Sequence, residues 1–182
     1  MTAIVGIVDR KTRTVWMGGD SAGTTASWKS CVRADSKVFR IGEFVFGFAG
    51  SFRMGQLIRY FTPPPLKEGQ DVYAYLVTAF IPAVRKVLVD GHWLQNKDGQ
   101  DIGGFFLVGF RGRLFRIESD MQVGEVFDDY VATGCGEQVC CGSLHATKGQ
   151  QPRARILKAL EAAAHHDAGV RPPFVIEKVK AR

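Results

Sequence analysis

The chain has 182 residues, of which 46% are hydrophobic and 23% charged, and 24 Lys and Arg against 18 Asp and Glu give a net charge of +6. This balance is typical of a globular protein and excludes collagen-like, coiled-coil and wholly disordered chains. The length predicts a single domain over residues 1–182. Its 21 Gly residues exceed the roughly 13 of an average chain of this length, which favours many tight turns between short strands.

The first 50 residues predict mainly strands. Apolar, β-branched runs flank the polar segment 9–12 and indicate a hairpin. A polar stretch over residues 20–36 reads as a loop with a short strand, and two further apolar runs surround Gly42. The predicted strands are 4–8, 14–17, 38–41 and 44–49.

Two helices are expected next. Ser51 can cap the first, which must end before the three prolines at 63–65. Asp71 can cap the second, which reaches Gly91 and should kink at Pro82. Its apolar residues recur every fourth position, as in a helix packed on a sheet: Val72, Leu76, Phe80, Val84 and Leu88.

The remaining third of the chain alternates between strands and helices in the same way. The predicted strands are 105–110, 113–117, 123–127, 130–133 and 174–179, and the predicted helices are 136–146 and 152–166. Strands, two helices, strands, two helices and a last strand indicate an α+β domain. Two sheets face to face, with a helix pair outside each, would use every element.

The sequence carries no sign of secretion, membrane insertion or nucleic-acid binding. No secretory signal is present, and no run reaches the 18 or so apolar residues that a membrane span needs. No block of five or six like charges occurs, so the basic charge does not indicate a nucleic-acid partner. The sparse cysteines favour reduced thiols and a cytoplasmic protein. They are Cys31, Cys135, Cys140 and Cys141.

Thr2 is the first candidate catalytic residue. Removal of Met1 would make Thr2 the N-terminus, and its α-amine, with an ordinary pKa near 8, could accept the proton of its own hydroxyl. Asp20 follows the second strand of the first hairpin, at the end where Thr2 begins the first strand. Lys37 precedes the next strand and could pair with Asp20, which would place a positive charge beside the hydroxyl. Gly47 could offer a backbone N–H to an oxyanion.

These positions form an ordered pattern that resembles proteasome β-subunits and the bacterial peptidase HslV. The matching segments are Thr2–Gly6, Gly19–Ser21, Lys37–Ile41, Gly47–Gly50 and Thr133–Gly136. Two further segments, Gly18–Gly23 and Arg53–Gln56, look closest to a bacterial and phage branch of proteasome homologues. The resemblance spans most of the chain and is densest in residues 2–51.

The resemblance implies an N-terminal-nucleophile (Ntn) hydrolase with a four-layer αββα sandwich. It implies a threonine-type endopeptidase with Thr2 as nucleophile, Asp20 and Lys37 as supports and Gly47 as oxyanion donor. Cys135 aligns with a family Ser and Asp167 with a family Asp that orient the N-terminus. A further family Ser falls at Val170, so its hydrogen bond would be missing. No cofactor or metal is implied.

The same resemblance implies how the protein would be organised. The chain would form a homo-oligomeric ring whose chamber admits peptides or unfolded proteins, with an ATPase unfoldase as a possible partner. Two other functions fit the fold: a catalytically inactive, ring-forming subunit, and an Ntn amidohydrolase that acts on a small amide.

Other site chemistry stays open at the level of sequence. Cys141 and His145, four residues apart on a helix, could bind zinc with Cys135 or Cys140. The segment His165–Asp167 could also bind a metal. A nucleophilic Cys31 or Cys135 with a distant histidine is a further alternative.

Overall fold

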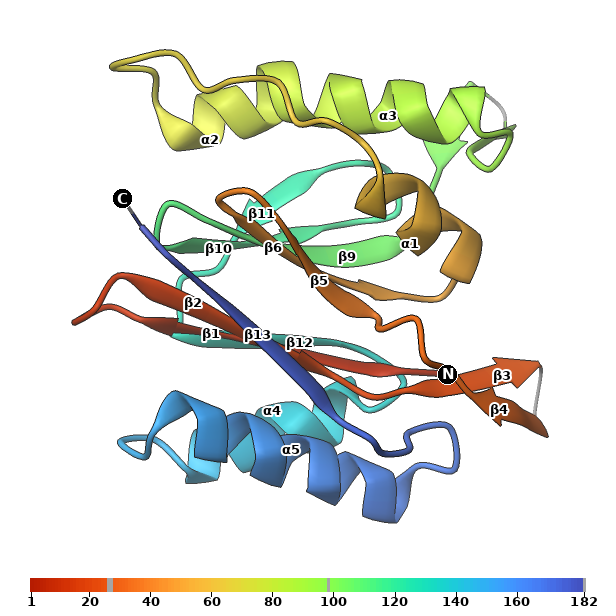
Figure 1. Ribbon diagram of the computed structural model, residues 1–182, viewed down its shortest axis with the longest axis vertical. Coiled ribbons are helices and arrows are strands. Elements are labelled where there is room, and N and C mark those ends of the chain that lie inside the picture. Colours follow the sequence, from red (N-terminus) through yellow and green to blue (C-terminus); the bar gives the residue numbers. More distant parts are fainter. Residues whose placement is uncertain (26–27, 98, 182) are drawn as a thin grey trace.

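The computed structural model describes residues 1–25, 28–97 and 99–181 as four layers, helices–sheet–sheet–helices (Figure 1). The predicted four-layer αββα sandwich is therefore confirmed. The two termini lie at opposite ends of the sandwich, with the N-terminus beside the β3–β4 hairpin (Figure 1).

The first sheet is antiparallel, with strand order β12-β1-β2-β13. Its strands are β1 (Ala3–Asp9), β2 (Thr14–Gly19), β12 (Tyr130–Gly134) and β13 (Val175–Lys180). The hairpin β1–β2 forms as predicted, and both strands are almost wholly buried because the sheet is covered on both faces. The final strand runs beside β2, so residues distant in sequence reach the end of the sheet where Thr2 lies.

The second sheet is also antiparallel, with order β11-β10-β9-β6-β5. Its strands are β5 (Val38–Ile41), β6 (Phe44–Ala49), β9 (Phe105–Phe110), β10 (Arg113–Ile117) and β11 (Val123–Glu125). The two sheets pack through a layer of aliphatic side chains and Met17, which includes Ile4, Val15, Val45, Leu107 and Leu114.

Two short hairpins lie outside these sheets and are not predicted from the sequence as pairs of strands. They are β3 (Ala22–Thr25) with β4 (Trp28–Val32), and β7 (Gln95–Lys97) with β8 (Gln100–Ile102). Both are short and rich in polar or small residues, so they lack the run of apolar residues that marks a strand in sequence.

The outer helices follow the predicted caps and breakers closely. They are α1 (Phe52–Arg59), α2 (Val72–Tyr75), α3 (Ile81–Asp90), α4 (Glu137–Ala146) and α5 (Pro152–His166), with a π-helical turn over Leu76–Phe80 between α2 and α3. The Ser51 hydroxyl accepts the N–H of Met54, and the Asp71 carboxylate accepts the N–H of Ala74. The distortion expected at Pro82 takes the form of this π turn, directly before α3.

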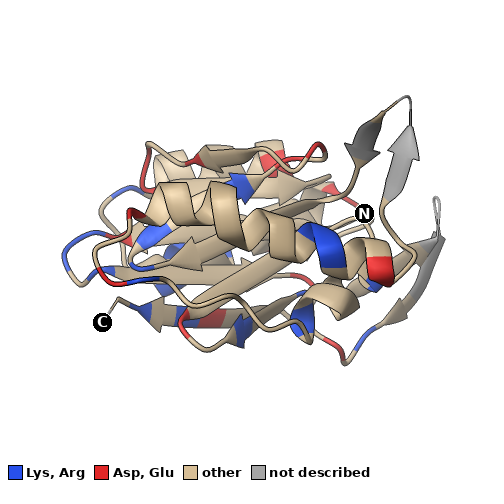
Figure 2. Ribbon diagram, turned by 90° about the horizontal axis from the view of Figure 1, so that it is seen from above, with Lys and Arg blue, Asp and Glu red and all other residues tan. Residues whose placement is uncertain are grey.

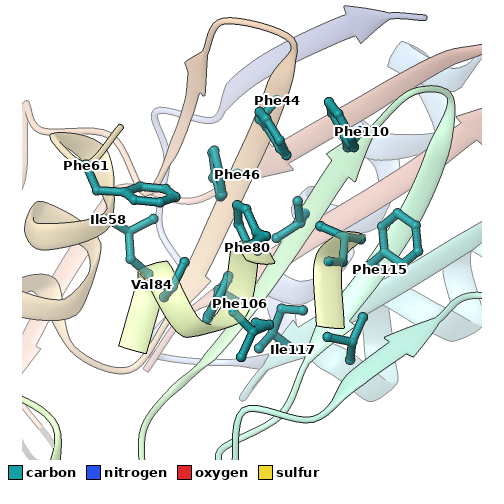
Figure 3. Close-up of a cluster of buried hydrophobic side chains, with 14 of the residues drawn as sticks. Phe44, Phe46, Ile58, Phe61, Phe80, Val84, Phe106, Phe110, Phe115 and Ile117 are labelled. Atoms are coloured by element: carbon teal, nitrogen blue, oxygen red, sulfur yellow. The ribbon is translucent and has the colours of Figure 1, made fainter. Parts of the chain in front are cut away.

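The helical stretch from Val72 to Asp90 packs on the second sheet. By length and composition it could cross a membrane, and 33% of it is buried. Its inward residues, Phe80 among them, join a cluster of phenylalanines that includes Phe44 and Phe46 (Figure 3). The stacked pair Phe44–Phe110 has ring centroids 4.0 Å apart. Charge on this helix gathers near its C-terminal end (Figure 2).

Helices α4 and α5 cover the outer face of the first sheet. Their buried residues pack against β1 and β12 through small and aliphatic side chains, including Cys140, Leu144, Ile156, Leu160 and Ala163. Helix α5 therefore ends beside the strand that begins at Ala3, and the segment after it reaches the N-terminal residues of the chain.

Candidate active site

Thr2 and Asp20 are brought together by the register of the β1–β2 hairpin. Ile4 lies opposite Gly19, so Ala3 faces Asp20 one step further along. The Asp20 N–H donates to the Ala3 carbonyl at 3.3 Å, and the Ala3 N–H donates to Asp20 Oδ1 at 3.1 Å. The neighbourhood that the sequence predicts for these two residues is thus present.

Lys37 joins them from the other sheet, because it directly precedes β5. Its Nζ donates to Thr2 Oγ1 at 2.9 Å and to Asp20 Oδ1 at 2.8 Å. All three residues are buried, with exposed fractions of 4% for Thr2, 1% for Asp20 and 1% for Lys37. Burial lowers the pKa of Lys37, while the charge and hydrogen bond of Asp20 act in the opposite direction.

Asp20 accepts further hydrogen bonds on its second oxygen. Oδ2 accepts the N–H groups of Ala22 at 2.9 Å and of Arg171 at 3.3 Å. Because both oxygens have fixed donors, the carboxylate is held in one orientation and presents Oδ1 to Lys37.

Cys135 contacts Thr2 just after the end of β12, and Asp167 lies next to Cys135. The Thr2 N–H donates to Cys135 Sγ at 3.0 Å, and the thiol reaches the Thr2 carbonyl at 3.3 Å. Desolvation and a hydrogen bond to Asp167 raise the pKa of Cys135, whereas the Thr2 N–H lowers it. Val170 is buried and donates its N–H to the Asp167 carbonyl at 3.2 Å, so no hydroxyl stands there.

Gly134 permits the close approach of β12 to Thr2. It has a φ of +98°, and a Cβ atom there would lie 2.2 Å from the Thr2 carbonyl oxygen. Any other residue would strain the backbone at this φ and clash with the Thr2 carbonyl, which explains why a glycine precedes Cys135.

Met1 occupies the space in front of Thr2. Its carbonyl accepts the Thr2 hydroxyl at 2.6 Å, and its amino group donates to Thr24 Oγ1 at 2.9 Å. While Met1 is attached, the Thr2 nitrogen is an amide and cannot accept a proton. Loss of Met1 would leave an amine at the same place, next to Cys135.

The prediction that Gly47 donates to an oxyanion is wrong. The N–H of Phe48 donates to the Lys37 carbonyl in β5 at 3.1 Å, so the N–H of Gly47 faces the opposite way, towards Leu107 in β9. A Cβ on Gly47 would lie 2.4 Å from Ile4 Cγ2. This glycine therefore lets the two sheets approach each other, and its N–H belongs to the strand ladder.

Gly50, three residues further, is a glycine that sequence reasoning did not single out, and its N–H lies outside the strand ladder. It follows the end of β6, has a φ of +94°, and a Cβ there would meet no atom within 4 Å. Among the described residues its N–H donates to no protein group. The next turn brings the Phe52 ring to 5.7 Å from Lys37 Nζ, so this segment borders the site. A glycine just past the strand end was the available signal.

The rival chemistries find little support in the part of the chain that is described. No three His, Cys, Asp or Glu side chains there gather as metal ligands would. His145 instead lies with Nδ1 3.4 Å from the Tyr130 hydroxyl. The raised pKa of Cys135 disfavours the thiolate that a nucleophilic cysteine needs. Cys31 is exposed.

Comparison with solved structures finds the same fold elsewhere. BPH from Thiobacillus denitrificans in complex with epoxomicin has a TM-score of 0.78 at 18% identity, and the similarity covers 100% of both chains. A second structure of Thiobacillus denitrificans BPH has a TM-score of 0.77 at 18% identity, over 100% of this chain and 99% of the other. Eukaryotic HslV from Trypanosoma brucei has a TM-score of 0.69 at 20% identity, over 98% and 99%.

At these identities the comparison establishes the fold. The HslV-like Ntn-hydrolase fold implied by the sequence is confirmed. No protein-family model matches the sequence, and no curated protein matches it.

Proposed function

We propose that this chain, which has the fold of the BPH and HslV structures, is a threonine-type peptidase whose nucleophile is Thr2. One observation carries the proposal: the buried Lys37 Nζ lies 2.9 Å from Thr2 Oγ1 and 2.8 Å from Asp20 Oδ1. A threonine hydroxyl that accepts a hydrogen bond from a buried, paired ammonium group is poised to lose its proton.

The chemistry begins once Met1 is removed. The α-amine of Thr2 accepts the hydroxyl proton, and Oγ1 attacks the carbonyl carbon of the peptide bond. The C–N bond then breaks, the amine fragment leaves with that proton, and an ester joins the substrate acyl group to Thr2. Water hydrolyses the ester and restores the hydroxyl. Lys37 stabilises the negative charge that develops on Oγ1.

The surrounding groups have supporting roles in this proposal. Cys135, backed by Asp167, holds the N-terminal nitrogen of Thr2. The free N–H of Gly50 stabilises the oxyanion, in place of Gly47. Since a thiol is a weaker hydrogen-bonding group than a hydroxyl, Cys135 orients the amine less firmly than a serine would.

We also propose that the chain acts as a cytoplasmic homo-oligomer that encloses its active sites in a ring. Its substrates are peptides or unfolded polypeptides, and an ATPase unfoldase is a possible partner. The full-length similarity to BPH and HslV supports this organisation. Because BPH is described in complex with epoxomicin, we expect this compound to bind at Thr2.

Intact mass together with peptide hydrolysis tests the proposal. The wild type should lose Met1 and cleave short peptides, whereas Thr2→Ala should retain its fold and show only background cleavage. Epoxomicin should raise the melting temperature of the wild type and leave that of Thr2→Ala unchanged.

Three results would redirect the assignment. Retention of Met1 without cleavage would favour the non-catalytic ring subunit. Hydrolysis confined to small amides would favour the amidohydrolase. Undiminished cleavage by Thr2→Ala would exclude Thr2 as the nucleophile.

A further inference from the structure

Arg171 ties the segment after α5 to the end of that helix. Its Nη1 donates to the carbonyls of Ala164 and Val170, both at 3.1 Å, and to that of Asp167 at 3.4 Å. The C-terminal carbonyls of a helix lack partners within the helix and carry partial negative charge. One guanidinium group therefore satisfies the helix end and folds the following segment back on it.

The main chain of Arg171 contacts the candidate active site directly. Its N–H donates to Asp20 Oδ2 at 3.3 Å, and its carbonyl accepts the Ser21 N–H at 3.0 Å. The same segment carries Asp167, which lies next to Cys135 and raises the pKa of its thiol. Residues 167–171 thus reach both sides of Thr2, through Asp20 on one and through Cys135 on the other.

We propose that Arg171 is a positioning residue for the Thr2 site: its side chain fixes residues 167–171 so that Asp167 reaches Cys135 and the Arg171 N–H reaches Asp20. The hydrogen bonds of the side chain go to the carbonyls around the end of α5, and none of them goes to Thr2 or Lys37. The expected effect of Arg171 on catalysis rests on the proposed peptidase function, whereas its expected effect on the pKa of Cys135 does not.

Arg171→Met is the variant that isolates this role. Methionine retains much of the apolar stem and donates no hydrogen bond, so three carbonyls lose their shared donor. The segment can then shift, and displacement of a catalytic group by about 1 Å can cost on the order of 100-fold in rate. We expect kcat to fall at least tenfold and KM to change less than threefold.

Arg153→Met is the matched control. Arg153 lies exposed in the first turn of the same helix, so this variant loses the same charge without touching residues 167–171. It should keep wild-type kcat and KM. Circular dichroism and thermal melting establish that each compared variant is folded.

A second measurement works without any peptidase activity. In a Cys31→Ser, Cys141→Ser background, the rate of Cys135 alkylation is followed against pH. Besides Asp167, the charges that face this thiol are Lys37 and the N-terminal amino group. Because burial and the nearby Asp167 both raise the Cys135 pKa, release of the segment should lower the alkylation midpoint in Arg171→Met. Arg153→Met should keep the parental midpoint.

The two readouts separate the two claims. If Arg171→Met lowers the alkylation midpoint of Cys135 but the wild type cleaves no peptide, the positioning role stands and the proposed peptidase function is contradicted. A midpoint and a kcat equal to those of Arg153→Met overturn the role of Arg171. If Arg171→Met does not fold, Arg171→Gln replaces it. The neutral amide of glutamine cannot reproduce all three contacts, so we expect smaller decreases in kcat and in the alkylation midpoint. If neither value decreases, the role of Arg171 is overturned.

Discussion

Lys37 is the buried charge on which the proposed chemistry of Thr2 depends. Lys37→Ala removes the positive charge beside the hydroxyl and leaves Asp20 buried without its partner. Loss of one such electrostatic contact costs about 10²- to 10³-fold in rate, and breaking a buried pair costs about 3–5 kcal/mol in stability. Peptide cleavage and chemical denaturation measure the two effects.

The control for this variant is Lys180→Ala. Lys180 is exposed near the end of β13, so its loss should change neither cleavage nor the unfolding midpoint. Normal cleavage by Lys37→Ala would contradict the proposed role of the ammonium group.

The same lysine should impose a pH limit on activity. Burial lowers the Lys37 pKa below its ordinary value of 10.5. As the pH rises, the ammonium form needed for catalysis is therefore lost before pH 10.5 is reached. In the window between the two values the unfolded chain binds more protons, and this residue therefore makes the free energy of unfolding rise with pH. Titration of the Lys37 side chain by NMR measures the shift. A midpoint at or above 10.5 would contradict it.

Gly50 can be tested against a glycine of similar conformation. Gly50→Ala forces a side chain into a φ of +94°, which should turn the N–H away and lower kcat by about 10- to 100-fold. Gly42, in the β5–β6 turn, also has positive φ and open space around it. Gly42→Ala should lose about 1 kcal/mol of stability and keep its kcat. Equal kcat values for both variants would exclude Gly50 as the oxyanion donor.

At the scale of elements, two helical glycines should respond in opposite directions to alanine. A Cβ on Gly55 in α1 would lie 2.2 Å from the ring of Phe48, which is itself buried. We expect Gly55→Ala to lose about 1–3 kcal/mol through overpacking. Gly142 in α4 is exposed with nothing near its Cβ position, so Gly142→Ala should gain about 0.5–1 kcal/mol. Denaturant unfolding measures both, and a stabilised Gly55→Ala would contradict the tight α1–β6 contact.

The elements that the sequence predicts well are those with a strong local pattern. Apolar residues at every fourth position predict the long helical stretch that starts at Val72. Ser51 and Asp71 cap their helices where expected. The β3–β4 and β7–β8 hairpins escape prediction because their strands carry no run of apolar residues, and in each hairpin the two strands pair with one another.

At the scale of the whole molecule, the proposed ring has a direct physical test. Light scattering coupled to size exclusion should give a mass that is a multiple of the 20.0 kDa chain. Thr2→Ala should give the same mass, because it alters one side chain within the site and no outer surface. A monomer in both proteins would contradict the ring while leaving the peptidase open to its own test.

The sequence by itself determined the layered fold and most of the candidate site. Hairpin patterning places Thr2 beside Asp20, because adjacent antiparallel strands fix which residues face each other. The place of Lys37 before a strand indicates its pairing with Asp20, whereas Cys135 and Asp167 rest on the family resemblance. Tertiary structure alone showed that the Gly47 N–H lies in the strand ladder, and it alone revealed the contacts of Arg171. The direction of an N–H depends on the register with a strand 60 residues away, and the contacts of Arg171 depend on how the end of α5 meets β1 and β2. Local sequence patterns do not contain either relation.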